Sequence, residues 1–304
     1  MKIVSLLPSA TELVYALGLG DDLSGVTFEC DYPPEARTKP VVSDTALPAD
    51  RPMSSGEIDA EVNRRMEAKE PLYVLDKELI RDIQPDLILT QDLCRVCAIP
   101  TGIVQDALDD LGCRAEVVSM DPSGLEEILE SFLEVGRATG TEPRAKELTT
   151  RLRERIDQVT AGAARLPTIR TFCMEWLDPP FVGGHWIPEM VALAAGENLL
   201  NEPRKRSREV TWREIADAAP EVVVFMPCGY YLEEAEQEAA RIYGVPEFRA
   251  TTAFASRTVY ATDASSYFSR PGPRIVDGLE ILAWAIHPDD FPPPPEDAIA
   301  RVAP

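Results

Sequence analysis

Two cysteines at close spacing are the first residues of this sequence that could perform chemistry. Cys94 and Cys97 form a Cys-x-x-Cys pair that follows a short apolar stretch at residues 87–89, which is typical of a buried strand. In an open α/β sheet, ligands bind at the loops beyond the carboxyl ends of the strands. The pair is therefore predicted to lie on the ligand-binding edge of a sheet.

Other cysteines occupy similar positions after predicted strands. Cys30 follows the strand-like residues 23–28, and Cys228 follows residues 222–225, which repeat the pattern seen before Cys94. Thiolates bind zinc, copper(I) and iron–sulfur clusters. One hypothesis is therefore a metal, cluster or redox site formed by Cys30, Cys94, Cys97 and Cys228, with His185 nearby. A thiolate that contacts a bound ligand is an alternative, and a structural zinc site usually needs more closely spaced ligands than these.

The two remaining thiols need no such role. Cys113 and Cys173 fit buried, small apolar side chains. Six cysteines among 304 residues do not make a disulfide scaffold. A reducing compartment is consistent with this usage.

Aromatic residues cluster after two strands of the second half of the chain. Trp176, Phe181 and Trp186 fall in one loop that also contains two glycines and several prolines, and Tyr267 and Phe268 fall in another. Flat rings give binding sites contact area and rigidity. These loops are predicted to line a binding site, with packing beneath a long loop as the alternative.

Composition excludes several classes of function. A formal charge of −22 opposes binding to nucleic acid, which depends on Lys and Arg displacing counterions. No run approaches the roughly 20 apolar residues of a membrane span, so no membrane insertion is expected. The first residues already form a strand pattern, which predicts a cytoplasmic protein as written, or a periplasmic or cell-surface protein if an export signal precedes this stretch.

The elements that position these residues alternate between strands and helices. Capping boxes are predicted at Ser9–Glu12, Ser54–Glu57, Ser123–Glu126 and Thr211–Glu214. Such alternation is typical of parallel sheets covered by helices. The predicted fold is α/β, with two lobes, each a parallel-sheet α/β sandwich, joined by a long rigid α-helix, and with a ligand cleft between them. The expected boundaries are an N-terminal lobe at 1–121, a helical linker at 122–164, a C-terminal lobe at 165–287 and a poorly ordered proline-rich tail at 288–304.

Several short motifs in this order resemble one family. The sequence is similar to the cobalamin (vitamin B12)-binding members of the helical-backbone (class III) ABC-transporter substrate-binding proteins, whose periplasmic-binding-protein-like fold is shared by siderophore and haem receptors. The similarity covers about residues 1–287. It is carried by residues 5–12 (SLLPSATE), 31–34 (DYPP), 85–88 (PDLI), 179–181 (PPF) and 268–274 (FSRPGPR).

The resemblance implies that a corrinoid is held between the lobes by aromatic side chains and backbone groups. It also implies a partner, an ABC permease contacted through acidic residues. The ligand contacts expected from the resemblance and from the loop positions are Ser9, Cys30, Tyr32, Trp176, Phe181, Trp186, Cys228, Tyr230, Tyr267, Phe268 and Arg270.

No motif for catalysis accompanies these residues. The sequence contains no Walker loop, no G-x-G-x-x-G and no Ser–His–Asp order, and only two histidines are available as bases. The prediction is therefore a non-catalytic binding protein with cobalamin or a related corrinoid as its ligand. The alternatives are a cysteine-ligated metal or iron–sulfur/redox protein on the same fold, a siderophore or haem-binding protein, and a corrinoid-handling enzyme.

Overall fold

A computed structural model of the chain describes residues 1–48, 53–93 and 99–303. The chain divides into two compact units. The first unit comprises residues 1–122 and 126–150, and the second comprises residues 123–125 and 151–304. Each contains a β-sheet, so the predicted α/β fold with two sheet-containing lobes is confirmed.

The first unit is built on a six-stranded sheet in the order β4-β3-β2-β1-β5-β6. All neighbouring strands are parallel except β3 and β4, which pair antiparallel at one edge. The sheet is thus parallel at its centre and antiparallel at that edge. Its strands are β1 (Ile3–Ser5), β2 (Leu23–Thr27), β3 (Val41–Thr45), β4 (Tyr73–Leu75), β5 (Leu87–Thr90) and β6 (Glu116–Ser119).

Apolar side chains on both faces of this sheet are buried. Val4 and Ile88 belong to a core that includes Ile80 of α3 and Leu108 of α4, while their neighbour Ile3 is also buried. Strands that are apolar at every position are typical of a sheet covered on both sides. The helices of this unit are α1 (Pro8–Ala16), η1 (Pro34–Thr38), α2 (Ser55–Ala68), α3 (Lys77–Ile83), α4 (Thr101–Leu111) and α5 (Leu125–Ala138).

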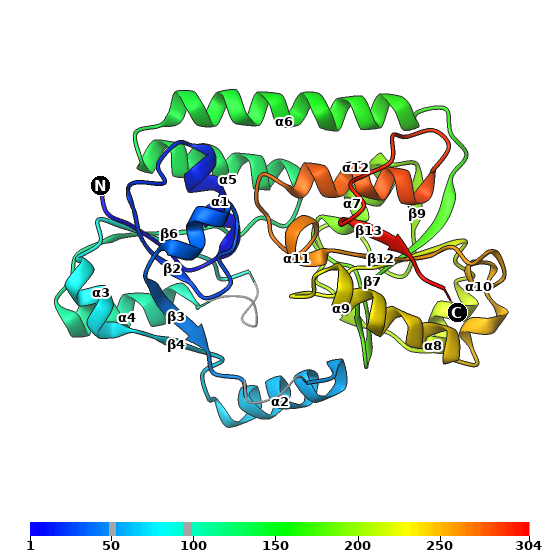
Figure 1. Cartoon of the computed structure of the whole chain (residues 1–304), viewed down its shortest axis with the longest axis horizontal. Helices are drawn as coiled ribbons and strands as arrows, with labels where there is room; N and C mark the ends of the chain where they lie inside the picture. Colours follow the sequence, from blue (N-terminus) through cyan, green and yellow to red (C-terminus); the bar gives the residue numbers. More distant parts are fainter. Residues whose placement is uncertain (49–52, 94–98, 304) are drawn as a thin grey trace. The chain divides into compact units, whose positions relative to one another are not determined.

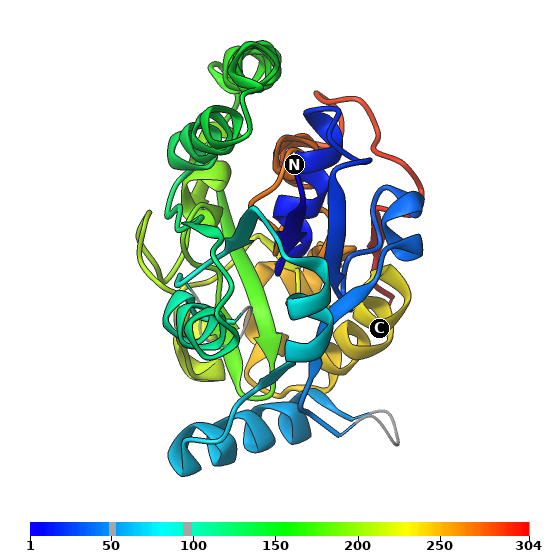
Figure 2. The ribbon, with the colours of Figure 1, turned by 90° about the vertical axis from the view of Figure 1, so that its left-hand side faces the viewer.

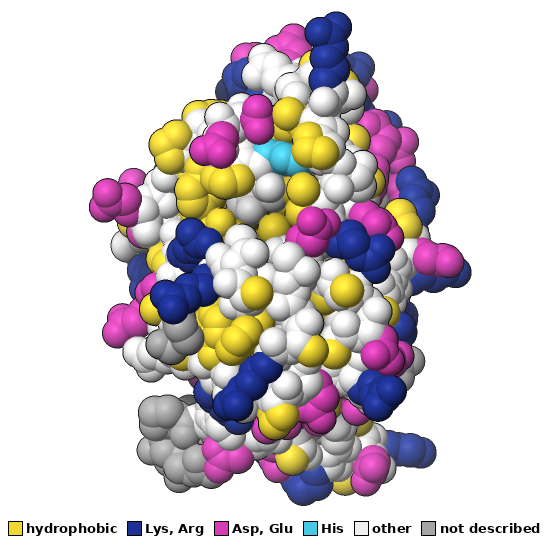
Figure 3. Space-filling view, turned by 90° about the vertical axis from the view of Figure 1, so that its right-hand side faces the viewer, with side chains coloured by type: hydrophobic (Ala, Val, Ile, Leu, Met, Phe, Trp, Pro, Cys, Tyr) yellow, Lys and Arg dark blue, Asp and Glu magenta, His cyan; other side chains and the backbone are white. Residues whose placement is uncertain are grey.

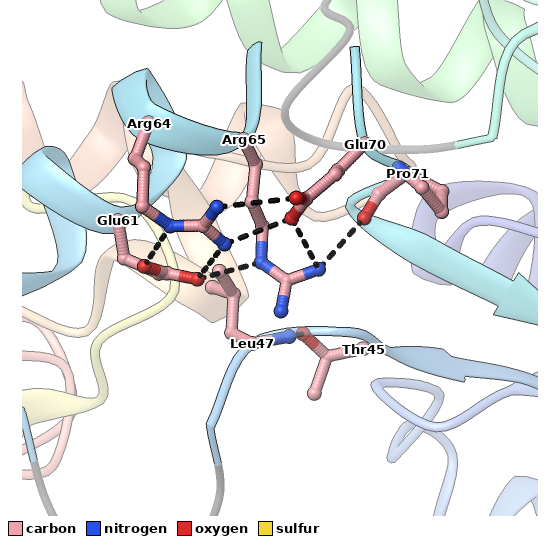
Figure 4. Close-up of polar contacts among 7 residues, drawn as sticks. All are labelled: Thr45, Leu47, Glu61, Arg64, Arg65, Glu70 and Pro71. Atoms are coloured by element: carbon pink, nitrogen blue, oxygen red, sulfur yellow. Dashed lines mark hydrogen bonds and ion pairs between the residues drawn. The ribbon is translucent and has the colours of Figure 1, made fainter. Parts of the chain in front are cut away.

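Helix α2 is an exception, because it extends away from the sheet of the first unit (Figures 1 and 2) and Ser55 is its one buried residue. The end of the helix is held by charge pairs. Arg64 binds Glu61 at 2.8 Å and Glu70 at 2.9 Å, and Arg65 binds Glu61 at 2.8 Å (Figure 4). Hydrogen bonds from Arg64 and Arg65 lower the pKa of Glu61 to about 2. The network ties the last helical turns to Glu70, in the segment that leads from α2 to β4.

The second unit is built on a seven-stranded sheet. Six of its strands run in the order β10-β8-β7-β11-β12-β13, and β9 pairs with β7. Strand β11 pairs in parallel with β7 and with β12. The pairs β7–β8, β8–β10 and β12–β13 are antiparallel. The strands are β7 (Ile169–Leu177), β8 (Pro180–Val182), β9 (Gly196–Asn198), β10 (Arg208–Glu209), β11 (Val222–Phe225), β12 (Val259–Thr262) and β13 (Ile299–Arg301).

A second core fills this unit. Phe172, Phe225 and Phe248 are among its fully buried residues. The long helix α6 (Glu142–Ala163) contributes to both units, and Arg155 in its second half pairs with Asp277 and Glu280. The other helices are α7 (Ile187–Leu193), α8 (Trp212–Asp217), α9 (Leu232–Ala239), η2 (Ala240–Gly244), η3 (Phe248–Ala250), α10 (Thr252–Ser256), α11 (Ala264–Tyr267) and α12 (Ile275–Ile286).

Two predictions about local structure are wrong. Helix α1 begins at Pro8 and its N-cap is Leu7, so Ser9 lies inside the helix and caps nothing. Proline at the first helical position has the required φ and lacks only an amide that would be unpaired there. The C-terminal residues are not a disordered tail, because β13 pairs with β12 and the side chains of Ala298 and Val302 are buried.

Among the described residues, no helix combines the length and apolarity that crossing a membrane requires. On the face shown in Figure 3, acidic and basic side chains are interspersed around apolar areas.

Candidate functional site

Three adjacent parallel strands of the second unit bring aromatic side chains to one edge of its sheet. Trp176 lies near the carboxyl end of β7, and Tyr230 follows β11. Their rings are 5.5 Å apart and meet edge to face. Both side chains are partly exposed. This geometry leaves aromatic surface available to a flat or apolar ligand.

Tyr267 joins this edge from the short helix α11 after β12. The amide of Ser265, in the same helix, donates to the carbonyl of Tyr230 at 3.0 Å, which fixes the two loops together. The guanidinium of Arg274 lies 5.7 Å from the centre of the Tyr267 ring. Burial raises the pKa of both tyrosines. We call Trp176, Tyr230 and Tyr267 the aromatic edge.

Asp263 adds a carboxylate beside the aromatic edge. It caps α11, because its Oδ1 accepts a hydrogen bond from the amide of Ser266 at 2.9 Å. Burial raises its pKa, and the Ser266 hydrogen bonds together with the charges of Arg274 and Arg270 oppose that rise. Asp263 was not among the predicted contacts, although an Asp placed between a buried strand and a helix is a recognisable N-cap signal.

Glu175 and Cys228 lie next to Trp176 and Tyr230. The amide of Cys228 donates to the carbonyl of Glu175 at 3.3 Å, and the Cys228 side chain is exposed. The Glu175 carboxylate accepts a hydrogen bond from the amide of Gly184 at 2.9 Å. Burial raises the pKa of this carboxyl group, while the bonds from Gly184 and Ser207 lower it.

Three predicted contacts are instead buried within the second unit. The indole N–H of Trp186 donates to the carbonyl of Phe268 at 3.0 Å, and both side chains are buried. Arg270 is also buried, and Phe181 is half-buried on β8. Trp186 and Phe268 therefore support the loops behind the aromatic edge.

The predicted contacts of the first unit differ in exposure. Ser9 is buried in α1, and Cys30 is buried with its sulfur 3.0 Å from the hydroxyl of Thr11. Tyr32 is 46 % exposed. Of these three residues, Tyr32 is the one whose side chain a ligand can reach.

The sequence interpretation missed a second aromatic pair in the first unit. The rings of Phe28 and Tyr73 are 6.5 Å apart, and Phe28 is 40 % exposed. Phe28 directly follows β2, which places it beyond the carboxyl end of a parallel strand. Its position after a strand, in the same loop as Tyr32, is the pattern that could have identified it.

The predicted cysteine site is not supported. Cys94 and Cys97 lie outside the described residues. Within the described ranges, no three His, Cys, Asp or Glu side chains are arranged to hold a metal ion. Cys30 is buried against Thr11, and Cys228 and His185 do not form such a group.

Comparisons with known proteins agree with this architecture. A family model described as periplasmic binding protein matches residues 3–266. One relative is a Bacillus subtilis (strain 168) protein named as an uncharacterized ABC transporter substrate-binding lipoprotein, YvrC. It is 25 % identical over 95 % of this chain and 81 % of its own length. The vitamin B12-binding protein of Yersinia pestis (strain Pestoides F) is 26 % identical over 73 % of this chain and 68 % of its own length. A heme-binding protein of Pseudomonas aeruginosa has the same fold, with a TM-score of 0.73 and 19 % identity, covering 100 % of this chain and 98 % of that protein.

The fold and these similarities define a solute-binding protein of ABC transporters. The chain belongs to the periplasmic binding protein family. Proteins of this class bind a small molecule and deliver it to a permease.

Proposed function

We propose that this protein binds cobalamin or a related corrinoid against the aromatic edge of the second unit and presents it to an ABC permease. The observation that carries the proposal is the edge-to-face pair of Trp176 and Tyr230 beyond the carboxyl ends of β7 and β11. A corrin ring is large and largely apolar, and its amide side chains need hydrogen-bond partners. The aromatic edge and the nearby Asp263 carboxylate supply these two kinds of contact.

The vitamin B12-binding relative supports the choice of ligand, because its similarity extends over most of this chain. Binding without chemistry is consistent with the absence of catalytic motifs from the sequence. We further propose that the protein works on the outer side of the membrane, where a solute-binding protein meets its permease.

The proposal is tested by titrating the protein with cyanocobalamin and measuring heat or the change in the visible spectrum. Micromolar or tighter binding is expected, and Trp176→Ala is expected to weaken it by about tenfold through loss of ring contact. Trp284→Ala is the matched control. Trp284 makes a similar edge-to-face contact with Tyr260, at 5.8 Å, but lies on α12 away from the strand ends. Absence of binding, or equal losses in the two variants, would contradict the proposal.

Haem is the second candidate ligand. Tyrosine hydroxyl groups can ligate haem iron, and the Arg274 guanidinium beside Tyr267 offers a partner for a propionate. Titration with hemin under the same conditions distinguishes the candidates. Tighter binding of hemin than of cyanocobalamin, lost in Tyr267→Phe, would favour haem.

A further inference from the structure

A basic segment interrupts this acidic chain. Four of the five residues from 204 to 208 are Arg or Lys, in a protein whose formal charge is −22. We call these five residues, Arg204, Lys205, Arg206, Ser207 and Arg208, the basic segment. All four charged residues of the segment are exposed. Neither the aromatic edge nor the predicted ligand contacts include them.

The backbone of the basic segment is fixed against the turn at His185. The amide of His185 donates to the carbonyl of Lys205 at 2.6 Å, and the amide of Arg204 donates to the carbonyl of His185 at 2.9 Å. The Asn201 side-chain amide donates to the carbonyl of Arg206 at 3.1 Å and to that of Gly183 at 2.9 Å. These bonds hold the segment on both sides of Lys205.

The close approach at Gly184 strengthens this attachment. A Cβ atom on Gly184 would lie 2.1 Å from the amide nitrogen of Ser207, so only glycine allows the two backbones to meet. The buried Glu175 carboxylate bonds both to the Gly184 amide and to Ser207. The segment therefore presents its side chains from a rigid backbone, and ordering it on binding costs little entropy.

The side chains differ in their internal partners. Arg208 donates to the carbonyl of Leu200 at 2.8 Å and lies 3.6 Å from Glu214. Lys205 and Arg206 make no ion pair with any residue that the structure describes. Many other cations of this acid-rich chain are neutralised internally, as Arg64 and Arg155 are. Two adjacent exposed cations thus remain available to an outside partner.

We propose that the basic segment is a docking surface for an acidic segment of a partner protein. The inference is independent of the proposed function and holds whichever ligand is carried. It concerns a contact other than the one with the permease, which the resemblance assigns to acidic residues of this chain. Screening limits the attraction to about 8 Å at physiological salt. A large anionic membrane surface is repelled by the remaining negative charge of the protein, whereas a few carboxylates on a peptide can approach Lys205 and Arg206 alone.

The test uses the full chain and a synthetic oligoglutamate peptide as the probe, with binding followed by fluorescence anisotropy at low salt. The wild-type protein is expected to bind, and added NaCl is expected to weaken binding. Replacing both cations, Lys205→Glu with Arg206→Glu, should reduce the affinity by about tenfold or more, since attraction becomes repulsion. The control, Arg165→Glu with Arg249→Glu, changes the charge equally at exposed positions of the same unit and should bind almost as the wild type does.

Three outcomes would overturn the inference: no binding by the wild type, equal losses in the two double variants, or binding to phosphatidylglycerol vesicles that depends more strongly on Lys205 and Arg206. Cyanocobalamin affinity is measured on the same variants and should not change. If the wild type fails to bind cyanocobalamin but the peptide results hold, the proposed ligand is wrong and the docking surface stands.

Discussion

The Glu175 carboxyl group links the aromatic edge to the basic segment, and its protonation is expected to affect stability. Burial raises its pKa above the value of 4.5 that an unperturbed Glu has. A carboxyl group whose pKa is higher in the folded state binds more protons when folded. Its contribution to stability is therefore fully present below pH 4.5 and is lost as the pH rises through the folded pKa.

Glu175→Gln is predicted to remove this pH dependence, because glutamine keeps an acceptor for Gly184 and Ser207 but cannot ionise. The free energy of unfolding of the variant, minus that of the wild type, should increase as the pH rises from 4.5 to neutral. Urea unfolding at several pH values measures this difference. A difference that stays constant with pH would show that Glu175 titrates in the folded protein as it does in the unfolded chain.

Trp186 and Trp176 provide a second prediction at the residue scale, because one is a buried hydrogen-bond donor and the other is part of the aromatic edge. Trp186→Phe leaves the carbonyl of Phe268 without its donor and should reduce the free energy of unfolding by about 1–3 kcal/mol. Trp176→Phe keeps an aromatic ring and should reduce the free energy of unfolding by less than Trp186→Phe does. Chemical denaturation of both variants measures this difference. Equal losses in the free energy of unfolding would contradict a supporting role for Trp186 and an exposed role for Trp176.

Individual residues show where sequence patterns suffice and where they do not. The capping boxes at Ser54 and Thr211 are confirmed. The same spacing at Ser9 does not form one, because the helix already begins at Pro8. The exposure of Trp186 and Cys30 could not be predicted, since it depends on which distant group each side chain contacts, the carbonyl of Phe268 for Trp186 and the hydroxyl of Thr11 for Cys30. Local patterns thus predicted two of these caps, whereas the division between supporting and accessible aromatic residues is a tertiary property.

At the scale of elements, a strongly apolar strand matches its predicted bounds. Strand β11 begins and ends where the sequence predicted, at residues 222–225. The stretch predicted as one helical linker, 122–164, contains two helices, α5 and α6. Strand β3 was missed, because its residues fall within a stretch rich in Pro, Ser and Asp and two of its five residues are polar and one is acidic. Strand β13 was missed because the prolines before it suggested disorder, while its pairing with β12 depends on a sheet formed by distant residues.

At Gly184, a single added methyl group should disturb the turn between β8 and α7. Gly184→Ala places a Cβ 2.1 Å from the Ser207 amide nitrogen, so the backbone must move. We expect a loss of about 1–3 kcal/mol in the free energy of unfolding, together with weaker binding of oligoglutamate as the basic segment shifts.

Gly102→Ala serves as the control for this substitution. Gly102 lies within α4, and nothing lies within 4 Å of its added Cβ. Alanine has the higher helix propensity, so this variant should gain up to about 1 kcal/mol. If Gly184→Ala is as stable as wild type in urea, the close approach to Ser207 does not constrain the basic segment.

At the scale of the whole molecule, the architecture could be predicted from the sequence and the ligand could not. The sequence predicted two lobes from the repeated strand and helix pattern, and the structure contains a separate apolar core in each unit. The specific ligand could not be predicted from the same pattern, because related sequences and folds bind vitamin B12 or heme. Ligand choice depends on a few side chains at the strand ends, which the fold tolerates in many combinations.

The net charge of −22 leads to the last prediction, in which two electrostatic effects oppose each other. Repulsion among surface carboxylates destabilises the compact state, and salt screens it. Salt also weakens the surface ion pairs, such as those of Arg64 with Glu61 and Glu70, but exposed pairs contribute at most about 1 kcal/mol each and often nothing. Repulsion should therefore dominate. The melting temperature at pH 7, measured by calorimetry, should rise as NaCl is raised from about 10 mM to about 150 mM, where the screening length falls to about 8 Å. A melting temperature that falls over this range would show that the ion pairs stabilise the fold more than the excess negative charge destabilises it.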